Sequence, residues 1–130
     1  MKKKKILLID DEEDFTNLTK MRLEHFGTYE VKVLLSTKDI IAHVHEFTPD
    51  VILLDLIMPG VDGIEVCEML DQDPVGMNIP IIVLSGLDKE ADKLRAYKCG
   101  VVDYIIKPIN WDALLKSIEQ SIKSKSKNNF

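Results

Sequence analysis

The chain has 130 residues and a formal net charge of −5, with 45% hydrophobic and 30% charged residues. This length allows one domain with a substantial core, and the composition is ordinary for a soluble globular protein. No apolar run approaches the roughly 20 residues of a membrane helix, and the acidic balance argues against general nucleic-acid binding. We therefore expect one domain that binds neither membranes nor nucleic acid.

The two ends of the chain are basic, and we expect them to be solvated. Lysines at 2–5 and the apolar run 6–9 superficially resemble a signal peptide, but the run is short and carboxylates follow it at once, so we expect a cytoplasmic protein. Cys67 and Cys99 form no C-x-x-C pair and are expected to be buried, reduced thiols. The domain is expected to cover 1–123, followed by a disordered tail over 124–130.

Strand and helix patterns alternate five times along the chain, with short connections between them. The predicted strands cover 4–9, 29–35, 51–54, 80–84 and 101–106. The predicted helices cover 15–26, 38–47, 64–70, 89–99 and 111–123. This alternation predicts a doubly wound α/β fold with an all-parallel sheet, in which ligands bind beyond the carboxyl ends of the strands.

Capping residues mark the ends of several predicted helices. N-caps are expected at Asp14, at Ser36 or Thr37, at Asp88 and at Asn110. Gly27 and Gly100 stand where a left-handed residue would close the first and fourth helices.

The apolar run 51–54 stops at Asp55, and a turn that contains Pro and Gly follows directly. Burying an ionised Asp within a sheet is costly, so Asp55 is expected at the carboxyl end of its strand, facing a crevice. Three other predicted strands end on groups that can act with it, namely Asp10 and Asp11, Ser85, and Lys107. Because these strand ends share one edge of a parallel sheet, we expect the five side chains to form one site.

Three carboxylates at adjacent strand ends repel one another, and a hard divalent cation removes that conflict. Mg²⁺ suits such a shallow site because it keeps several waters and takes the rest of its shell from carboxylates and phosphate. Zn²⁺ is not expected, since no cysteine or histidine stands at a strand end.

An anionic group that meets a cation, the Lys107 ammonium, the Ser85 hydroxyl and a backbone N–H near Gly86 is best explained as a phosphoryl group. Asp55 is then placed as an oxygen nucleophile, and its neighbours neutralise the charge of the transferring group.

These residues give the chain a resemblance to the receiver domain of two-component response regulators, similar to the chemotaxis regulators. The resemblance extends over about 4–123 and includes Asp10-Asp11, Asp55 with Met58-Pro59-Gly60 and Asp62-Gly63, Ser85-Gly86 and Lys107-Pro108. It implies a flavodoxin-like (βα)5 sandwich with strand order 2-1-3-4-5. Flavodoxin itself is a poorer match, because acidic residues replace its phosphate-binding loop after the first strand.

The resemblance also implies a role for each site residue. Asp55 would accept a phosphoryl group from a histidine kinase or a phosphotransfer protein. Asp11 would bind Mg²⁺ directly, Asp10 mainly through water, and Asp55 and the backbone carbonyl of Ile57 would complete the protein ligands. Ser85 and Lys107 would hold the phosphoryl oxygens. The Lys107-Pro108 bond is expected to be cis.

A switch is implied as well. Phosphorylation would draw Ser85 inward and turn Tyr104 from an exposed to a buried position, which changes the surface of the fourth helix, fifth strand and fifth helix. A downstream protein, still unidentified, would recognise that surface, and a phosphorylation-dependent dimer could form through it. The chain ends soon after the fifth helix, so we expect no output domain within it.

Two other functions were weighed against this one. A Mg²⁺-dependent phosphohydrolase of the haloacid dehalogenase type carries a second Asp two residues after its nucleophile, where this chain has Ile57. We therefore expect no enzyme activity beyond the protein's own phosphotransfer and slow autodephosphorylation. A module that is never phosphorylated would need none of these groups. Ile57 and Leu87 are apolar, and we expect them to shield the acyl phosphate from water.

Overall fold

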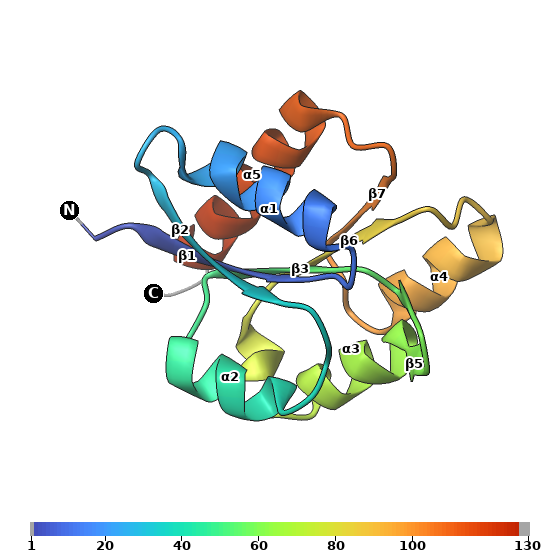
Figure 1. The fold of residues 1–130 in the computed structure, drawn as a ribbon. Helices are drawn as coiled ribbons and strands as arrows, with labels where there is room; N and C mark the ends of the chain where they lie inside the picture. The colour runs from blue at the N-terminus through green and yellow to red at the C-terminus, as the bar shows by residue number, and fades with distance from the viewer. Residues whose placement is uncertain (1, 128–130) are drawn as a thin grey trace.

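The computed structural model describes residues 2–127, and Figure 1 shows a central sheet covered by helices on both faces. Five parallel strands form the sheet in the order β2-β1-β3-β6-β7. In chain order they are β1 (Lys4–Ile9), β2 (Tyr29–Leu34), β3 (Val51–Leu54), β6 (Ile81–Ser85) and β7 (Asp103–Ile106). The flavodoxin-like fold and the predicted strand order 2-1-3-4-5 are thus confirmed.

Four helices connect the strands of the sheet, and a fifth follows the last strand. They are α1 (Glu13–Glu24), α2 (Ile40–Phe47), α3 (Gly63–Asp71), α4 (Glu90–Lys98) and α5 (Trp111–Lys127). Two short elements were not predicted, a hairpin of β4 (Ile57–Met58) with β5 (Val61–Asp62) and the 3-10 turn η1 (Gly76–Asn78). Within the described part of the chain, no helix is both long and apolar enough to cross a membrane.

The sheet separates two apolar cores, which explains why its central strands are apolar on both faces. Leu7 and Ile9 of β1 pack into the core under α2, α3 and α4, whereas Ile6 and Leu8 pack into the core under α1 and α5. All four residues of β3 are fully buried. The hydrophobic effect therefore fixes β1 and β3 in the middle of the sheet, and the groups that follow them lie at its centre.

Three of the predicted N-caps are wrong, each because the helix begins elsewhere. α1 has Glu12 at its N-cap position, so Asp14 lies inside the helix. α2 begins after Asp39, which has φ of 56°, and α4 begins after Lys89. The short polar side chains at 36, 37 and 88 therefore stand outside the helices that they were expected to cap.

The remaining caps are confirmed. Asn110 accepts a hydrogen bond from the backbone N–H of Ala113 at 3.1 Å. Gly27 and Gly100 adopt φ of 74° and 91°, a conformation that costs glycine little. α5 continues to Lys127 rather than ending near residue 123, and the last part of the predicted tail, 128–130, lies outside the described residues.

The two cysteines differ in exposure. Cys67 of α3 is fully buried, and burial raises the pKa of its thiol to about 12. Cys99 at the end of α4 is partly exposed, so the prediction of two buried thiols is wrong for this residue. Both are free, as expected.

Candidate functional site

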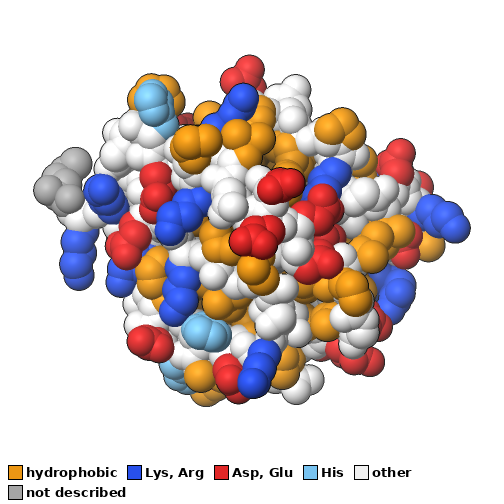
Figure 2. All heavy atoms as spheres, viewed as in Figure 1, with side chains coloured by type: hydrophobic (Ala, Val, Ile, Leu, Met, Phe, Trp, Pro, Cys, Tyr) orange, Lys and Arg blue, Asp and Glu red, His pale blue; other side chains and the backbone are white. Residues whose placement is uncertain are grey.

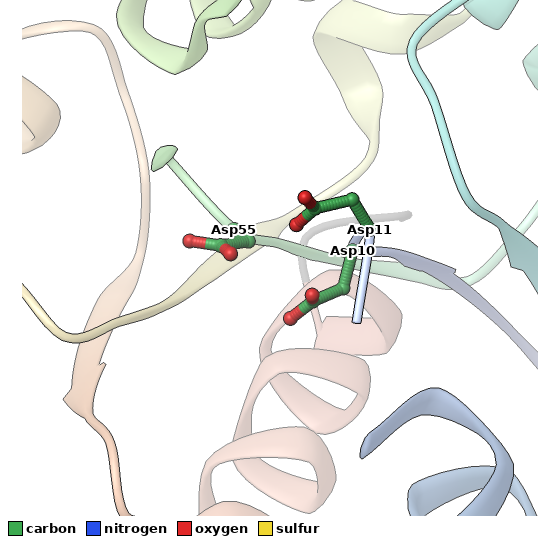
Figure 3. A group of neighbouring side chains, drawn as sticks. All are labelled: Asp10, Asp11 and Asp55. Carbon is green, nitrogen blue, oxygen red and sulfur yellow. The ribbon is translucent and has the colours of Figure 1, made fainter. Parts of the chain in front are cut away.

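The carboxyl ends of β1 and β3 bring three carboxylates together. Ile9 of β1 pairs with Leu54 of β3, so the residues that follow these strands leave the sheet side by side. One carboxylate oxygen from each of Asp10, Asp11 and Asp55 lies within 4.8 Å of the other two. Figure 3 shows the three side chains leaving neighbouring strand ends and reaching into the same space.

Asp10 is fully buried and is fixed through both oxygens. Oδ1 accepts a hydrogen bond from the backbone N–H of Glu12 at 2.9 Å, which turns the chain into α1. Oδ2 lies 2.7 Å from the Lys107 ammonium, a short charge-assisted contact. A buried charge is tolerated only when it is paired in this way.

Asp55 is 4% exposed and has one oxygen held by the backbone. Oδ1 accepts a hydrogen bond from Ile57 N–H at 3.0 Å, and Oδ2 faces the Lys107 ammonium at 3.5 Å. Burial raises the pKa of Asp55 above its ordinary value, and the Ile57 N–H and the Lys107 charge only partly oppose that rise. Oδ2 is therefore the less firmly held oxygen of a desolvated carboxylate.

Lys107 follows β7 and lies between the carboxylates. Its backbone N–H donates to the carbonyl of Ser85 at 2.8 Å, which ties the loop to β6, and the Lys107-Pro108 bond is cis as predicted. Burial lowers the pKa of Lys107, but the hydrogen bond from its ammonium to Asp10 and the charges of Asp55 and Asp10 outweigh this and raise it. The ammonium is thus a permanent positive charge at the site.

Ser85 and Tyr104 meet at the loop after β6. The fully buried Ser85 hydroxyl accepts a hydrogen bond from Leu87 N–H at 3.1 Å. Tyr104 is 9% exposed, and its hydroxyl donates to the Leu87 carbonyl at 2.9 Å. Tyr104 therefore occupies the buried position of the expected switch, linked to Ser85 through one loop residue.

The loop between β3 and α3 is shaped by Asp62 and Gly63. The side chain of Asp62 accepts a hydrogen bond from Ile64 N–H at 3.0 Å and caps α3. A Cβ on Gly63 would lie 2.5 Å from the Cα of Leu56, so only glycine fits there. The loop leaves the Ile57 side chain 50% exposed beside Asp55.

Two neighbours of Lys107 were missed from sequence. The carboxylate of Glu12 lies 3.2 Å from the ammonium, and the centroid of the Phe15 ring lies 4.3 Å from it. Glu12 directly follows the predicted pair Asp10-Asp11, and this adjacency was the available signal. The contact between Glu12 and Lys107 depends on the conformation of the lysine side chain, which the sequence does not predict.

The donor set fits a hard divalent cation. Three carboxylates supply oxygen ligands within a small space, no sulfur or imidazole ligand joins them among the described residues, and the carbonyl of Ile57 belongs to the adjoining loop. Figure 2 shows acidic side chains gathered on the surface over the carboxyl ends of the strands, where a cation would offset their repulsion.

The sequence of this chain is similar to those of known signalling proteins. Residues 6–119 match the family model described as the response regulator receiver domain. The chain is 33% identical over 119 residues to the phosphate regulon transcriptional regulatory protein PhoB of Rhizobium meliloti (strain 1021), covering 92% of this chain and 52% of that protein. It is 35% identical over 106 residues to response regulator PleD of Caulobacter vibrioides (strain NA1000 / CB15N), covering 82% of this chain and 23% of that protein. The match therefore spans about half of the first relative and about a quarter of the second.

A solved structure agrees with these matches. The signal receiver domain of a DNA binding response regulator protein (merR) from Colwellia psychrerythraea 34H is 30% identical, with a TM-score of 0.85, and the match covers 92% of this chain and 98% of that one. Because the family model matches most of the sequence and the fold agrees, the chain belongs to the response regulator receiver domain family of two-component signalling.

Proposed function

We propose that this protein accepts a phosphoryl group on Asp55 from the phosphohistidine of a sensor histidine kinase or phosphotransfer protein. The observation that carries the proposal is the buried Asp55 carboxylate, held at Oδ1 by Ile57 N–H and facing Lys107 with Oδ2. Such a group is desolvated, oriented and close to a fixed positive charge, which suits an oxygen nucleophile.

We propose 1–123 as the receiver domain and the cytoplasm as its location.

The transfer needs little covalent chemistry from the protein. Oδ2 of Asp55 forms a bond to phosphorus while the bond from phosphorus to the imidazole nitrogen breaks, and that nitrogen keeps the electron pair. The Lys107 ammonium and the Ser85 hydroxyl would hold phosphoryl oxygens, and the Ile57 N–H keeps the acyl oxygen in place. Mg²⁺, when held by Asp11, Asp55 and the Ile57 carbonyl, with Asp10 acting through water, would supply positive charge for the phosphoryl oxygens.

The output of the switch is proposed at the surface formed by α4, β7 and α5. Movement of Ser85 toward a phosphoryl group would pull on the Leu87 loop, which also holds the Tyr104 hydroxyl. Leu94 and Tyr97 of α4 are 57% and 46% exposed, and such apolar surface can bind a downstream protein or a second copy of the chain. The phosphoryl group would thus shift the equilibrium between two packings of the surface formed by α4, β7 and α5.

A hydrolytic enzyme is a weaker candidate. The position two residues after Asp55 carries Ile57, whose apolar side chain cannot donate or accept a proton for repeated turnover. We therefore propose that the chemistry is limited to the protein's own phosphotransfer and slow autodephosphorylation.

The test is phosphorylation by a small phosphodonor. The protein is incubated with Mg²⁺ and acetyl phosphate, and its intact mass is measured beside that of an Asp55→Asn variant. We expect one phosphoryl adduct on the wild type and none on the variant. An unmodified wild type would refute the proposal, and multiple turnover of a phosphomonoester would favour the hydrolase instead.

A further inference from the structure

The Lys107 ammonium is surrounded by three carboxylates at unequal distances. Its nitrogen lies 2.7 Å from Asp10, 3.2 Å from Glu12 and 3.5 Å from Asp55. An ammonium has three hydrogens to donate, so these three acceptors already account for its capacity. The two shorter contacts are both made to residues of the β1–α1 connection.

An aromatic ring holds the same ammonium. Phe15, in the first turn of α1, lies with its ring centroid 4.3 Å from the Lys107 nitrogen, within the range of a cation–π interaction. The ring also packs against the core under α1 and α5, so its position is fixed. Glu12 and Phe15 together hold Lys107 on the α1 side of the site.

The two short carboxylate contacts differ in how easily they can be given up. The side chain of Asp10 is 1% exposed, so breaking its pair would leave a buried charge without a partner. The Glu12 side chain is 62% exposed, and water can solvate its carboxylate as soon as Lys107 leaves. Of the two, Glu12 is the partner that Lys107 can release.

We propose that Glu12 is a positioning residue that competes with the phosphoryl group for the Lys107 ammonium. Bonding of phosphorus to Asp55 Oδ2 would turn the most distant of the three acceptors into a bridging oxygen and place new phosphoryl oxygens beyond it, so Lys107 would have to shift toward Asp55 and away from Glu12. Glu12 releases Lys107 when Asp55 is modified and recaptures it when the phosphoryl group leaves. This step rests on the proposed phosphorylation of Asp55, and it makes Glu12 a determinant of how much of the protein is phosphorylated.

The test uses beryllofluoride, which binds to a carboxylate as a phosphoryl mimic, in the presence of Mg²⁺. Its affinity is measured by calorimetry for the wild type, Glu12→Gln and Glu13→Gln. Glu13 is the matched control because its neutralisation removes the same charge one residue along, and no described ion pair joins it to Lys107. We expect Glu12→Gln to bind about two- to fivefold more tightly than Glu13→Gln, as the loss of one exposed ion pair predicts.

A second measurement needs neither Mg²⁺ nor beryllofluoride. The side-chain ammonium signal of Lys107 is recorded by nuclear magnetic resonance for the same three proteins. We expect Glu12→Gln to shift this signal and Glu13→Gln to leave it near the wild-type position, which a purely structural effect on α1 would not produce.

The outcomes separate the two proposals. If the wild type binds beryllofluoride but Glu12→Gln binds it no more tightly than Glu13→Gln, the role of Glu12 is overturned and the proposed function stands. Weaker binding by Glu12→Gln would also overturn it, because Glu12 would then support the productive position of Lys107. A wild type that binds no beryllofluoride and forms no phosphoryl adduct overturns both.

Discussion

α3 and α4 pack on the same face of the sheet and each has nine residues, yet they are anchored very differently. α3 buries Gly63, Ile64, Val66, Cys67 and Leu70. α4 buries only Ala96 and leaves Leu94 and Tyr97 about half exposed. Because burial of apolar surface holds a helix in place, α4 can be displaced at a much lower free-energy cost than α3.

This difference in packing matches the different roles of the two helices in the proposed function. α3 comes directly after the Asp55 loop, so its firm packing keeps the acceptor carboxylate and the Ile57 N–H in register. α4 comes after the Ser85 loop, whose position is expected to change on phosphorylation. Under the proposed function, the site thus lies beside the firmly packed α3, and the signal would leave through the loosely packed α4.

The largest expected effect is on the free energy of unfolding, which should fall much more for a truncated side chain in α3 than for one in α4. Leu70→Ala in α3 removes a fully buried side chain and should lower the free energy of unfolding by about 2–5 kcal/mol. Leu94→Ala in α4 removes a side chain that is 57% exposed and should change it by no more than about 0.5 kcal/mol. Urea unfolding of both variants measures the difference, and equal losses would show that α4 is anchored as firmly as α3.

The next effect concerns the start of α3. Gly63→Ala would place a Cβ 2.5 Å from the Leu56 Cα, and relieving this clash should cost roughly 1–3 kcal/mol of unfolding free energy. Gly86→Ala is the control in the other loop, because no atom lies within 4 Å of its added Cβ. The two are compared by urea unfolding and by calorimetric beryllofluoride affinity. If Gly63→Ala is no less stable than Gly86→Ala, the close packing of α3 on the Asp55 loop is contradicted.

The sequence predicts the rigid part of the molecule better than the rest. Apolar runs that end on Asp10, Asp55, Ser85 and Lys107 determine which groups share one sheet edge, because parallel strands in one layer must end together. The N-cap at Asp14 was wrong because Asp10 turns the chain earlier, through its contact with the Glu12 backbone. That turn depends on tertiary position, which local propensity does not contain.

The contacts of long side chains also could not be predicted. Lys107 reaches Glu12, 95 residues earlier in the chain, only because β7 and β1 end at the same edge of the sheet. Tyr104 packs into the core under α2, α3 and α4, and its hydroxyl donates to the Leu87 carbonyl. The sequence predicts that Lys107 and Tyr104 lie at the site. It does not predict which groups they contact, because the competing contacts of Lys107 differ in length by only a few tenths of an ångström.

A further prediction concerns how long the phosphoryl group survives beside the rigid helix. Ile57→Asn replaces an apolar side chain next to Asp55 with one that can hydrogen-bond a water molecule, so the acyl phosphate should hydrolyse several-fold faster. Ile57→Val keeps the apolar character and should stay near the wild-type lifetime. The decay of the phosphorylated mass after removal of the phosphodonor measures both, and an unchanged or longer lifetime for Ile57→Asn would contradict the shielding role.

The smallest expected effect lies just beyond the end of α3, where Asp73 anchors the following turn. Its carboxylate accepts hydrogen bonds from Gly76 N–H at 2.8 Å and Val75 N–H at 3.0 Å, and it lies 2.8 Å from His45 of α2. The Gly76 N–H, followed by the His45 contact, holds the pKa of Asp73 below its ordinary value.

A carboxyl group whose pKa is lowered by folding stabilises the folded state above its unfolded pKa of about 3.9, and this contribution is lost as the pH falls through the folded pKa. Asp73→Asn should therefore be less stable than the wild type at pH 5, and the difference should shrink at pH 3. Urea unfolding at these two pH values measures this, with Asp71→Asn as the control for loss of charge alone. A stability difference that stayed constant down to pH 3 would mean that ionisation of Asp73 does not stabilise the turn that follows α3. The firm end of α3 would then depend on apolar burial alone.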